Sequence, residues 1–191
     1  MILKKASRKA INYACKYFHY AKSVPVNVHG YSVFENNEWC GVILYSLGAN
    51  NNLAKSFDLS QGQVIELVRV ALNGKQSITS KVVSVSLRLI KKDIPLSLLC
   101  VSYADEKQNH KGTIYQATNW FYCGTISAES AIDPQDGKIK HTRILHSKYG
   151  SIKGFKRVKD KPKHKYIYPL DKNLVSLCEG LSKPYPNASI A

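Results

Sequence analysis

The hydrophobic residues of this chain fall into short blocks that predict strands and helices in alternation. Residues 24–34 and 39–47 are rich in Val, Ile, Leu and aromatic side chains, and the Glu-Asn-Asn-Glu turn between them predicts a β-hairpin. A Gly-Ala-Asn-Asn-Asn run at 48–52 breaks the chain, and a short helix is expected around 53–57. Another strand is predicted over 63–72, where Val and Ile recur.

The middle of the chain predicts a strand–helix–strand–helix order. Ser77 is placed as the N-cap of a helix that Pro95 prevents from continuing. A strand over 96–103 and a second helix to about Phe121 follow. A strand–helix–strand crossover implies a parallel pair of strands, so the predicted fold class is α/β, with a mixed central sheet flanked by helices. The apolar positions of the first helix recur at helical spacing: Ile78, Val82, Val85 and Leu89.

Both ends of the chain are predicted to add elements to this core. Ser7 is expected to cap a short basic helix that runs through Tyr17. Residues 139–145 and 165–170 are expected to form later strands, and residues 184–191 a loose tail. The predicted organisation is a basic N-terminal helix (1–22), an α/β core (23–137), basic strands and loops that complete the same domain (138–172) and a C-terminal tail (173–191).

The positive charge of the chain is concentrated at its two ends. The net charge is +15; residues 1–22 carry six Lys or Arg and no acid, and residues 138–172 carry twelve against two acids. A basic surface on a nearly neutral core is typical of a nucleic-acid-binding protein, although it also attracts other polyanions. The residues predicted to contact DNA phosphates form a basic run near several aromatic side chains: Lys156, Arg157, Lys159, Lys161 and Lys163.

Composition excludes several classes of protein. With 191 residues and 44% apolar content, the chain can form one domain with a sizeable core. It has no apolar run of about 20 residues and no signal-peptide core, so we expect a soluble cytoplasmic protein with no membrane partner. Its five dispersed cysteines predict buried, reduced thiols rather than a disulfide framework or a zinc ribbon. The motifs of P-loop, Rossmann, zinc-peptidase, serine-hydrolase and deaminase enzymes are absent from the sequence.

Chemistry-bearing side chains are densest between residues 103 and 120. Asp105 follows an apolar strand, and a polar turn with His110 precedes a helix that presents Tyr115. Open α/β sheets bind ligands at the ends of their strands, so we expect a site at this point. Asp105 could act there as a general base, a metal ligand or an anchor for the helix.

Arg69 and His19 stand out from their surroundings. Arg69 lies inside the apolar strand at 63–72, where a half-buried guanidinium needs a carboxylate or an anionic ligand. Asp105 on a neighbouring strand is its predicted partner. Such a pair either has a purely structural role or holds the two side chains in place for a ligand. His19 follows the basic helix, and with His110 and Asp105 it could supply the two-histidine, one-carboxylate set of non-haem iron. A packing role for His19 is the alternative.

The turn after the strand at 63–72 is a candidate phosphate site. Asn73, Gly74 and Lys75 lead into the next helix, where backbone N–H groups can bind an anion and Lys75 adds charge. An ordinary turn with a helix cap is the alternative interpretation.

Taken together, these residues resemble the motifs of the phage Mom family of DNA-modification proteins. The likeness covers residues 15–170, and the order and spacing of its motifs are more specific than any one of them. It implies a fold like that of the GCN5-related N-acetyltransferases, which agrees with the predicted order of elements. It also implies an active site made of five residues: His19, Tyr20, Arg69, Asp105 and Tyr115.

The resemblance further implies a reaction, a donor and a metal. The reaction converts the N6 amino group of adenine in double-stranded DNA to a methylcarbamoyl (carbamoylmethyl) group and protects phage DNA in the bacterial cell from host restriction. Acetyl-CoA and iron are implied participants, and our assignment of iron ligands is His19, Tyr20 and Asp105. One departure concerns the donor. Related acetyltransferases hold the CoA pyrophosphate at a glycine-rich turn, whereas this turn offers only Gly74, so another acyl or alkyl donor stays open.

Adenine N6 is a poor nucleophile because its lone pair is delocalised into the ring. Asp105 is our choice for the base or metal ligand, with Tyr115 and His19 orienting the adenine. Arg69 would keep Asp105 ionised or hold an anionic donor. Two alternatives from other classes are a noncatalytic DNA-binding protein of a mobile element and an N-acetyltransferase that acts on protein or RNA.

Overall fold

The computed structural model describes residues 1–47, 52–127 and 129–186. The chain break predicted at 48–52 and the last residues of the predicted tail lie largely outside these ranges. The main body is a sheet of seven strands in the order β1-β2-β3-β4-β5-β10-β6, and only β4 and β5 run parallel within it. The strands are β1 (Ile2–Lys5), β2 (His29–Glu35), β3 (Glu38–Ser46), β4 (Val64–Leu72), β5 (Leu99–Asp105), β6 (Phe121–Ile126) and β10 (Lys163–Pro169).

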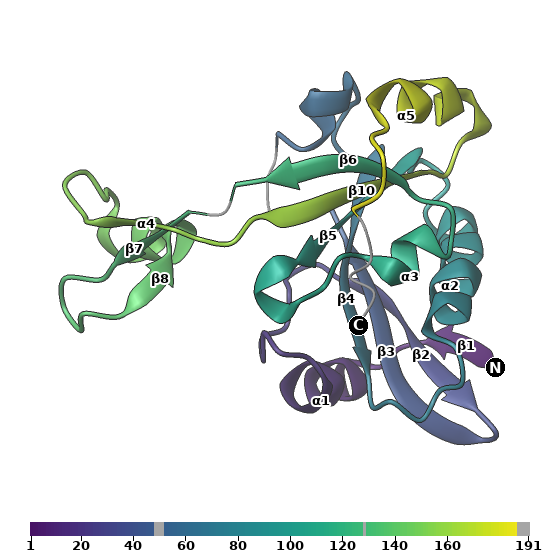
Figure 1. The fold of residues 1–191 in the computed structure, drawn as a ribbon. Coiled ribbons are helices and arrows are strands. Elements are labelled where there is room, and N and C mark those ends of the chain that lie inside the picture. The colour runs from purple at the N-terminus through teal and green to yellow at the C-terminus, as the bar shows by residue number, and fades with distance from the viewer. Residues whose placement is uncertain (48–51, 128, 187–191) are drawn as a thin grey trace.

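Helices cover both faces of this sheet (Figure 1). Alternate residues of β3 point to opposite faces, so Val42 and Leu44 pack under α1 while Ile43 and Tyr45 belong to the core under α2. α5 and η1 cover the β5–β10 part of the α1 face. The helical elements of the main body are α1 (Arg8–Phe18), η1 (Ala54–Phe57), α2 (Thr79–Asp93), η2 (Glu106–Gln108), α3 (Thr113–Gln116), η3 (Lys172–Leu174) and α5 (Val175–Leu181).

The two parallel strands separate part of the way along the sheet. The pairing of β4 with β5 runs from Val64 to Leu67 and ends opposite Ser102. Just beyond it, the register of β4 against β3 shifts, so Val68 is the extra residue of a β-bulge. β4 continues along β3, whereas β5 continues along β10. An opening therefore forms between the carboxyl ends of the only parallel pair in the described sheet.

Residues 129–162 form an arm that extends away from the main body (Figure 1). Its sheet has the order β8-β7-β9, and it has a small core of its own, in which Ala131, Leu145 and Ile152 are buried beside Phe155. Asp133 is fully buried in the arm and forms ion pairs with two lysines. The elements of the arm are β7 (Glu129–Ile132), β8 (Ile139–His141), α4 (Thr142–Tyr149) and β9 (Arg157–Lys159).

Much of the predicted secondary structure is confirmed. The hairpin, the strand of β4, the crossover helix α2 and the parallel pair all occur, and Ser7 caps α1 by accepting a hydrogen bond from the backbone N–H of Ala10. All five cysteines are free thiols, as expected. None of the described helices is both long enough and apolar enough to cross a bilayer.

Several predicted elements are wrong. The helix expected to reach Phe121 is a single turn, because Asn119 takes a positive φ of 59° and the chain then enters β6. The strand expected at 139–145 becomes α4 after three residues. The predicted tail at 173–191 contains α5, which buries Cys178.

The ends of two other predicted elements also differ. Residues 1–22 contribute the edge strand β1 as well as a helix. Ser77 does not cap α2, because its hydroxyl and its backbone N–H both donate to the Glu35 carboxylate. The buried stripe of α2 is Val82, Val83, Ser86, Leu87 and Ile90, and Ile78 is exposed.

Candidate active site

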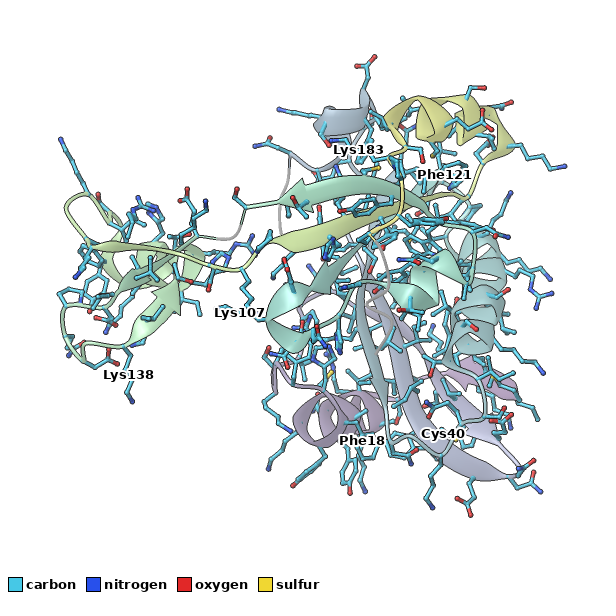
Figure 2. All side chains as sticks on the ribbon, in the orientation of Figure 1. Phe18, Cys40, Lys107, Phe121, Lys138 and Lys183 are labelled. Atoms are coloured by element: carbon cyan, nitrogen blue, oxygen red, sulfur yellow. The ribbon has the colours of Figure 1, made fainter. Side chains whose placement is uncertain are left out.

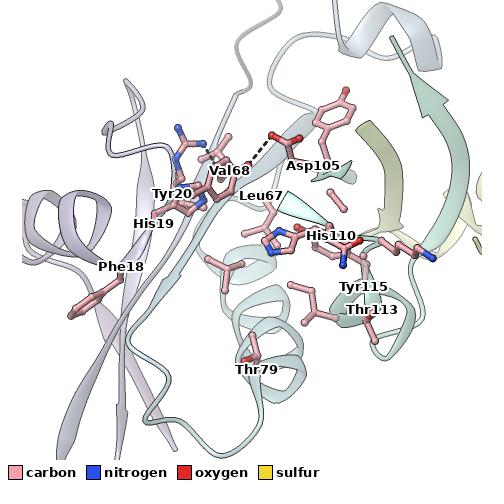
Figure 3. Close-up of a pocket in the computed structure, with 18 residues that line it drawn as sticks. Phe18, His19, Tyr20, Leu67, Val68, Thr79, Asp105, His110, Thr113 and Tyr115 are labelled. Atoms are coloured by element: carbon pink, nitrogen blue, oxygen red, sulfur yellow. Dashed lines mark hydrogen bonds between the residues drawn. The ribbon is translucent and has the colours of Figure 1, made fainter. Parts of the chain in front are cut away.

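A cavity of about 380 Å³ lies in the opening between β4 and β5 (Figure 3). Its walls come from the end of α1, from the two diverging strands and from residues 109–115. This is within the size range of sites for small molecules or single nucleobases. The cavity is lined by all five residues of the predicted active site: His19, Tyr20, Arg69, Asp105 and Tyr115.

Asp105 and Tyr20 meet across the cavity, although they are 85 residues apart in the chain. Asp105 is the last residue of β5, and its Oδ1 accepts a hydrogen bond from the backbone N–H of Lys107 (2.9 Å), which caps η2. The Tyr20 hydroxyl donates to Asp105 Oδ2 at 3.4 Å, the contact drawn as a dashed line in Figure 3. Burial and the Asp105 charge raise the pKa of Tyr20, so the tyrosine keeps its proton.

His19 is held as a neutral ring beside Tyr20. The two rings stack with centroids 4.4 Å apart. Burial, together with the positive charges of Arg69, His110 and Lys22, lowers the pKa of His19 to about 4. His19 Nδ1 accepts a hydrogen bond from the backbone N–H of Ala21 (3.1 Å), so the neutral ring carries its proton on Nε2. His19 is therefore a hydrogen-bond donor toward a ligand at neutral pH.

Arg69 lines the cavity without a carboxylate partner. Its Nη1 donates to the carbonyl oxygen of Val68 (2.7 Å) and its Nη2 to Ser23 Oγ (3.4 Å). Arg69 forms no ion pair with any described acid, and its buried Nε has no hydrogen-bond partner there. The predicted pair with Asp105 is wrong because β4 and β5 have already diverged, so that Arg69 lies beside β3 and Asp105 beside β10. The guanidinium remains suited to an anionic ligand.

Tyr115 forms the back of the cavity. It is buried, its ring packs against Trp120 and Tyr166, and its hydroxyl lies 2.8 Å from Ser102 Oγ. Burial raises the pKa of Tyr115, so the phenol stays protonated. Gly112, at the start of α3, has a φ of +84°, and a Cβ at this position would lie 2.3 Å from the Tyr166 ring. Only glycine therefore lets α3 pack closely enough to place Tyr115.

Sequence reasoning missed some residues of the site. Ser102 and Ser23 hold Tyr115 and Arg69, and no pattern around either serine distinguishes it from an ordinary strand or loop residue. Tyr103 was not missed, since it begins the dense stretch of the sequence; it lines the cavity, and burial and the Glu66 charge raise its pKa to about 12. His110, predicted only as a possible iron ligand, packs edge-on against Tyr20 with ring centroids 6.1 Å apart.

The iron set of His19, Tyr20 and Asp105 stays a prediction. Within the described residues, no group of three His, Cys, Asp or Glu side chains is placed to hold a metal. All three side chains of the predicted set line the cavity; Tyr20 donates to Asp105 Oδ2, and His19 Nδ1 accepts from the backbone N–H of Ala21, which leaves Nε2 as the imidazole nitrogen for a ligand.

The candidate phosphate turn is satisfied by its own side chains. Asn73 Oδ1 accepts from the backbone N–H of Lys75 (3.0 Å), and Lys75 Nζ pairs with Glu38 at 2.8 Å. The Glu35 carboxylate accepts from the backbone N–H of Ser77 (2.6 Å). Gly74 has a φ of +84° and open space around it. These contacts favour the ordinary-turn interpretation, because two carboxylates stand where an anion would bind.

The residues predicted to contact DNA lie in the arm and at the start of β10. Lys156, Arg157, Lys159 and Lys161 are exposed, and Arg157 pairs with Glu129 at 3.3 Å. Lys107 forms an ion pair with Asp160 of the arm, and Figure 2 shows Lys107 on the side of the main body that faces the arm. The short η2 helix that follows Asp105 is thus connected directly to the basic arm.

Comparison with known proteins agrees with this architecture. The family model described as the Mom protein family matches residues 1–187. No curated protein matches the sequence significantly.

Three solved structures illustrate the likeness in fold. The aminoglycoside 6'-N-acetyltransferase from Enterococcus faecium is similar with a TM-score of 0.51 and 8% identity, over 98% of this chain and 100% of that one. A Bacillus subtilis acetyltransferase in complex with CoA gives 0.50 and 10%, over 87% and 97%. The spermidine/spermine N-acetyltransferase of Vibrio cholerae gives 0.51 and 9%, over 91% and 94%. The predicted N-acetyltransferase-like fold is confirmed.

Proposed function

The chain belongs to the Mom protein family, and we propose that it is a transferase that converts adenine N6 in double-stranded DNA to its methylcarbamoyl derivative, protecting phage DNA from host restriction. The observation that carries this proposal is the convergence of five residues from four separate segments on one cavity, where an aspartate and a neutral histidine donor share the lining with an arginine that pairs with no described carboxylate. The acetyltransferase-like fold supports a group-transfer reaction.

The proposed reaction needs a base because the N6 lone pair is delocalised. Asp105 accepts the N6 proton as the N6–carbon bond forms, and the bond from that carbon to the leaving group breaks with its electron pair on the leaving group. Tyr20 donates to Asp105 and fixes its carboxylate plane. The Nε2–H of His19 donates to an acceptor on the adenine ring, and Tyr115 supplies an apolar ring edge at the back.

Arg69 holds the anionic part of the donor in this proposal. Its half-buried guanidinium has no described carboxylate partner, so an anion supplies the missing charge. The carbon that bonds to N6 is the methylene of the carbamoylmethyl group, so this step needs an alkyl donor that carries that group on its leaving group; direct acyl transfer from acetyl-CoA would give an N6-acetyl product instead. The CoA of the Bacillus subtilis neighbour supports a CoA-linked donor, but Glu35 and Glu38 face the turn at 73–77. Its pyrophosphate would have to bind elsewhere.

The substrate base reaches the cavity by leaving the duplex. Extrusion of one base costs a few kcal/mol, which phosphate contacts on both sides can offset. The exposed arm lysines and arginine supply such contacts in this proposal, and the Lys107–Asp160 ion pair ties them to the loop of Asp105.

A nucleoside analysis tests the proposal. The protein is expressed in bacteria, plasmid DNA is digested to nucleosides, and mass spectrometry looks for deoxyadenosine heavier by one carbamoylmethyl group. We expect the adduct with the wild-type protein, its loss with Asp105→Asn, and its retention with Asp58→Asn, a matched change at an exposed residue outside the cavity. Unmodified DNA from a folded wild-type protein would overturn the proposal, and acetylated protein or RNA instead would favour the N-acetyltransferase alternative.

A further inference from the structure

A second groove lies on the α1 face of the sheet, at the edge formed by β1 and β2. α1 packs over β3 and β4, where its buried residues meet Val42, Leu44 and Ala71. A groove of about 680 Å³ opens between α1 and the outer strands β1 and β2. Ser32 and Phe34 of β2 form part of its floor.

Aromatic rings line this groove. Trp39 lies within 5.8 Å of the Tyr13 ring and 5.6 Å of the Phe18 ring, centroid to centroid. Tyr13 is half exposed. Phe34 adds a further ring. The exposed Tyr13 ring and the partly exposed Trp39 ring offer flat surfaces onto which other planar groups can stack.

Positive charge surrounds the rings. Lys4, Lys5 and Lys9 line the groove and are exposed, and no acidic residue is among the described residues that line it. None of the three lysines forms an ion pair with a carboxylate in the described part of the chain. Lys4 Nζ lies 5.9 Å from the Phe34 ring centroid, so charge and ring can act on one ligand.

We propose that this groove binds unpaired nucleotides of a DNA strand, with bases stacked on Tyr13 and Trp39 and phosphates held by Lys4 and Lys9. Basic grooves with exposed rings bind single strands in this way, with little sequence preference. A duplex presents its phosphates but not its base faces, so the rings favour unpaired bases. The inference deepens the proposed function and rests on it only in taking DNA as the partner.

The groove adjoins the candidate active site. Phe18, the last residue of α1, lines both cavities, and His19 and Tyr20 follow it directly. A strand whose adenine enters the active-site cavity can therefore continue past the end of α1 into the groove. In that role the groove keeps the neighbouring nucleotides unpaired while the adenine is extruded.

Titration with oligothymidylate tests the inference, because this ligand has no adenine and no modification reaction is involved. Trp120 is fully buried, so quenching of tryptophan fluorescence reports on Trp39. We expect saturable quenching by the wild-type protein and about tenfold weaker binding by Tyr13→Ala. Ile78→Ala is the control, since Ile78 is exposed to a similar extent before α2 and does not line the groove.

Charge variants supply a second readout. Lys4→Gln combined with Lys9→Gln should reduce the slope of log affinity against log salt by about 1.4, and Lys16→Gln should not. Binding by Tyr13→Ala as tight as wild type, or equal weakening by Ile78→Ala, would overturn the inference. Asp105→Asn should bind oligothymidylate normally, so a failure of the modification reaction leaves this test intact.

Discussion

Removal of one hydroxyl group tests the geometry of the candidate active site most directly. Tyr20→Phe keeps the ring that stacks on His19 and contacts His110, and it deletes only the hydrogen bond to Asp105 Oδ2. A hydrogen bond to a charged group contributes about 1.5–3 kcal/mol, and the 3.4 Å separation places this one at the lower end. Since 1.4 kcal/mol corresponds to a factor of ten, we expect the modification rate to fall about tenfold.

The assay follows modified deoxyadenosine over time in plasmid DNA, with thermal unfolding of each variant measured in parallel. Tyr20 is 46% exposed, so its unfolding free energy should change by less than about 0.5 kcal/mol. Tyr17→Phe removes a hydroxyl at similar exposure on the same segment and should leave the rate unchanged. An unaltered rate in Tyr20→Phe, or an equal fall in Tyr17→Phe, would refute the placement of Tyr20 beside the base.

Three further predictions concern proton binding, packing and charge. The pKa of His19 in the folded protein is about 4, below its ordinary value of 6.5, so the unfolded chain binds more protons between these pH values. The free energy of unfolding, measured by denaturant titration, should therefore fall as the pH drops from 6.5 to 4. This decrease should be smaller in His19→Gln. Gly112→Ala should cost about 1–3 kcal/mol of unfolding free energy more than Gly62→Ala, because both have positive φ but only the first meets a ring. The slope of log duplex affinity against log salt, measured by filter binding, should decrease by about 3–4 when four arm residues are changed to Gln: Lys156, Arg157, Lys159 and Lys161. An unchanged slope would show that this run faces away from DNA.

The sequence predicted the elements whose signals are local. The hairpin strands and β4 have a clear β-rich pattern, and Ser7 stands where a cap is needed. The five candidate residues came from a motif whose spacing reflects a fixed three-dimensional arrangement, and they line one cavity. Local pattern and family resemblance therefore support each other here.

What the sequence could not show depends on contacts between distant segments. Trp120 and the aromatic residues after it fit a buried helix or a buried strand equally well, and only pairing with β10 selects the strand β6. The Arg69–Asp105 pair looked sensible from neighbouring strands, but the bulge at Val68 separates them. The arm was missed because its core is small and its strands are only three or four residues long.

The point at which β4 and β5 separate links the fold to the chemistry. A sheet loses hydrogen bonds where two strands diverge, and buried backbone groups there need other partners. Ser102 meets that need, since its hydroxyl lies 2.8 Å from the Leu67 carbonyl oxygen and 2.8 Å from the Tyr115 hydroxyl. The side chain that closes the end of the parallel pair therefore also fixes the back wall of the cavity. The same serine thus lies where the strands separate and holds Tyr115 in place. This explains why the candidate site lies beside the only parallel pair of the described sheet.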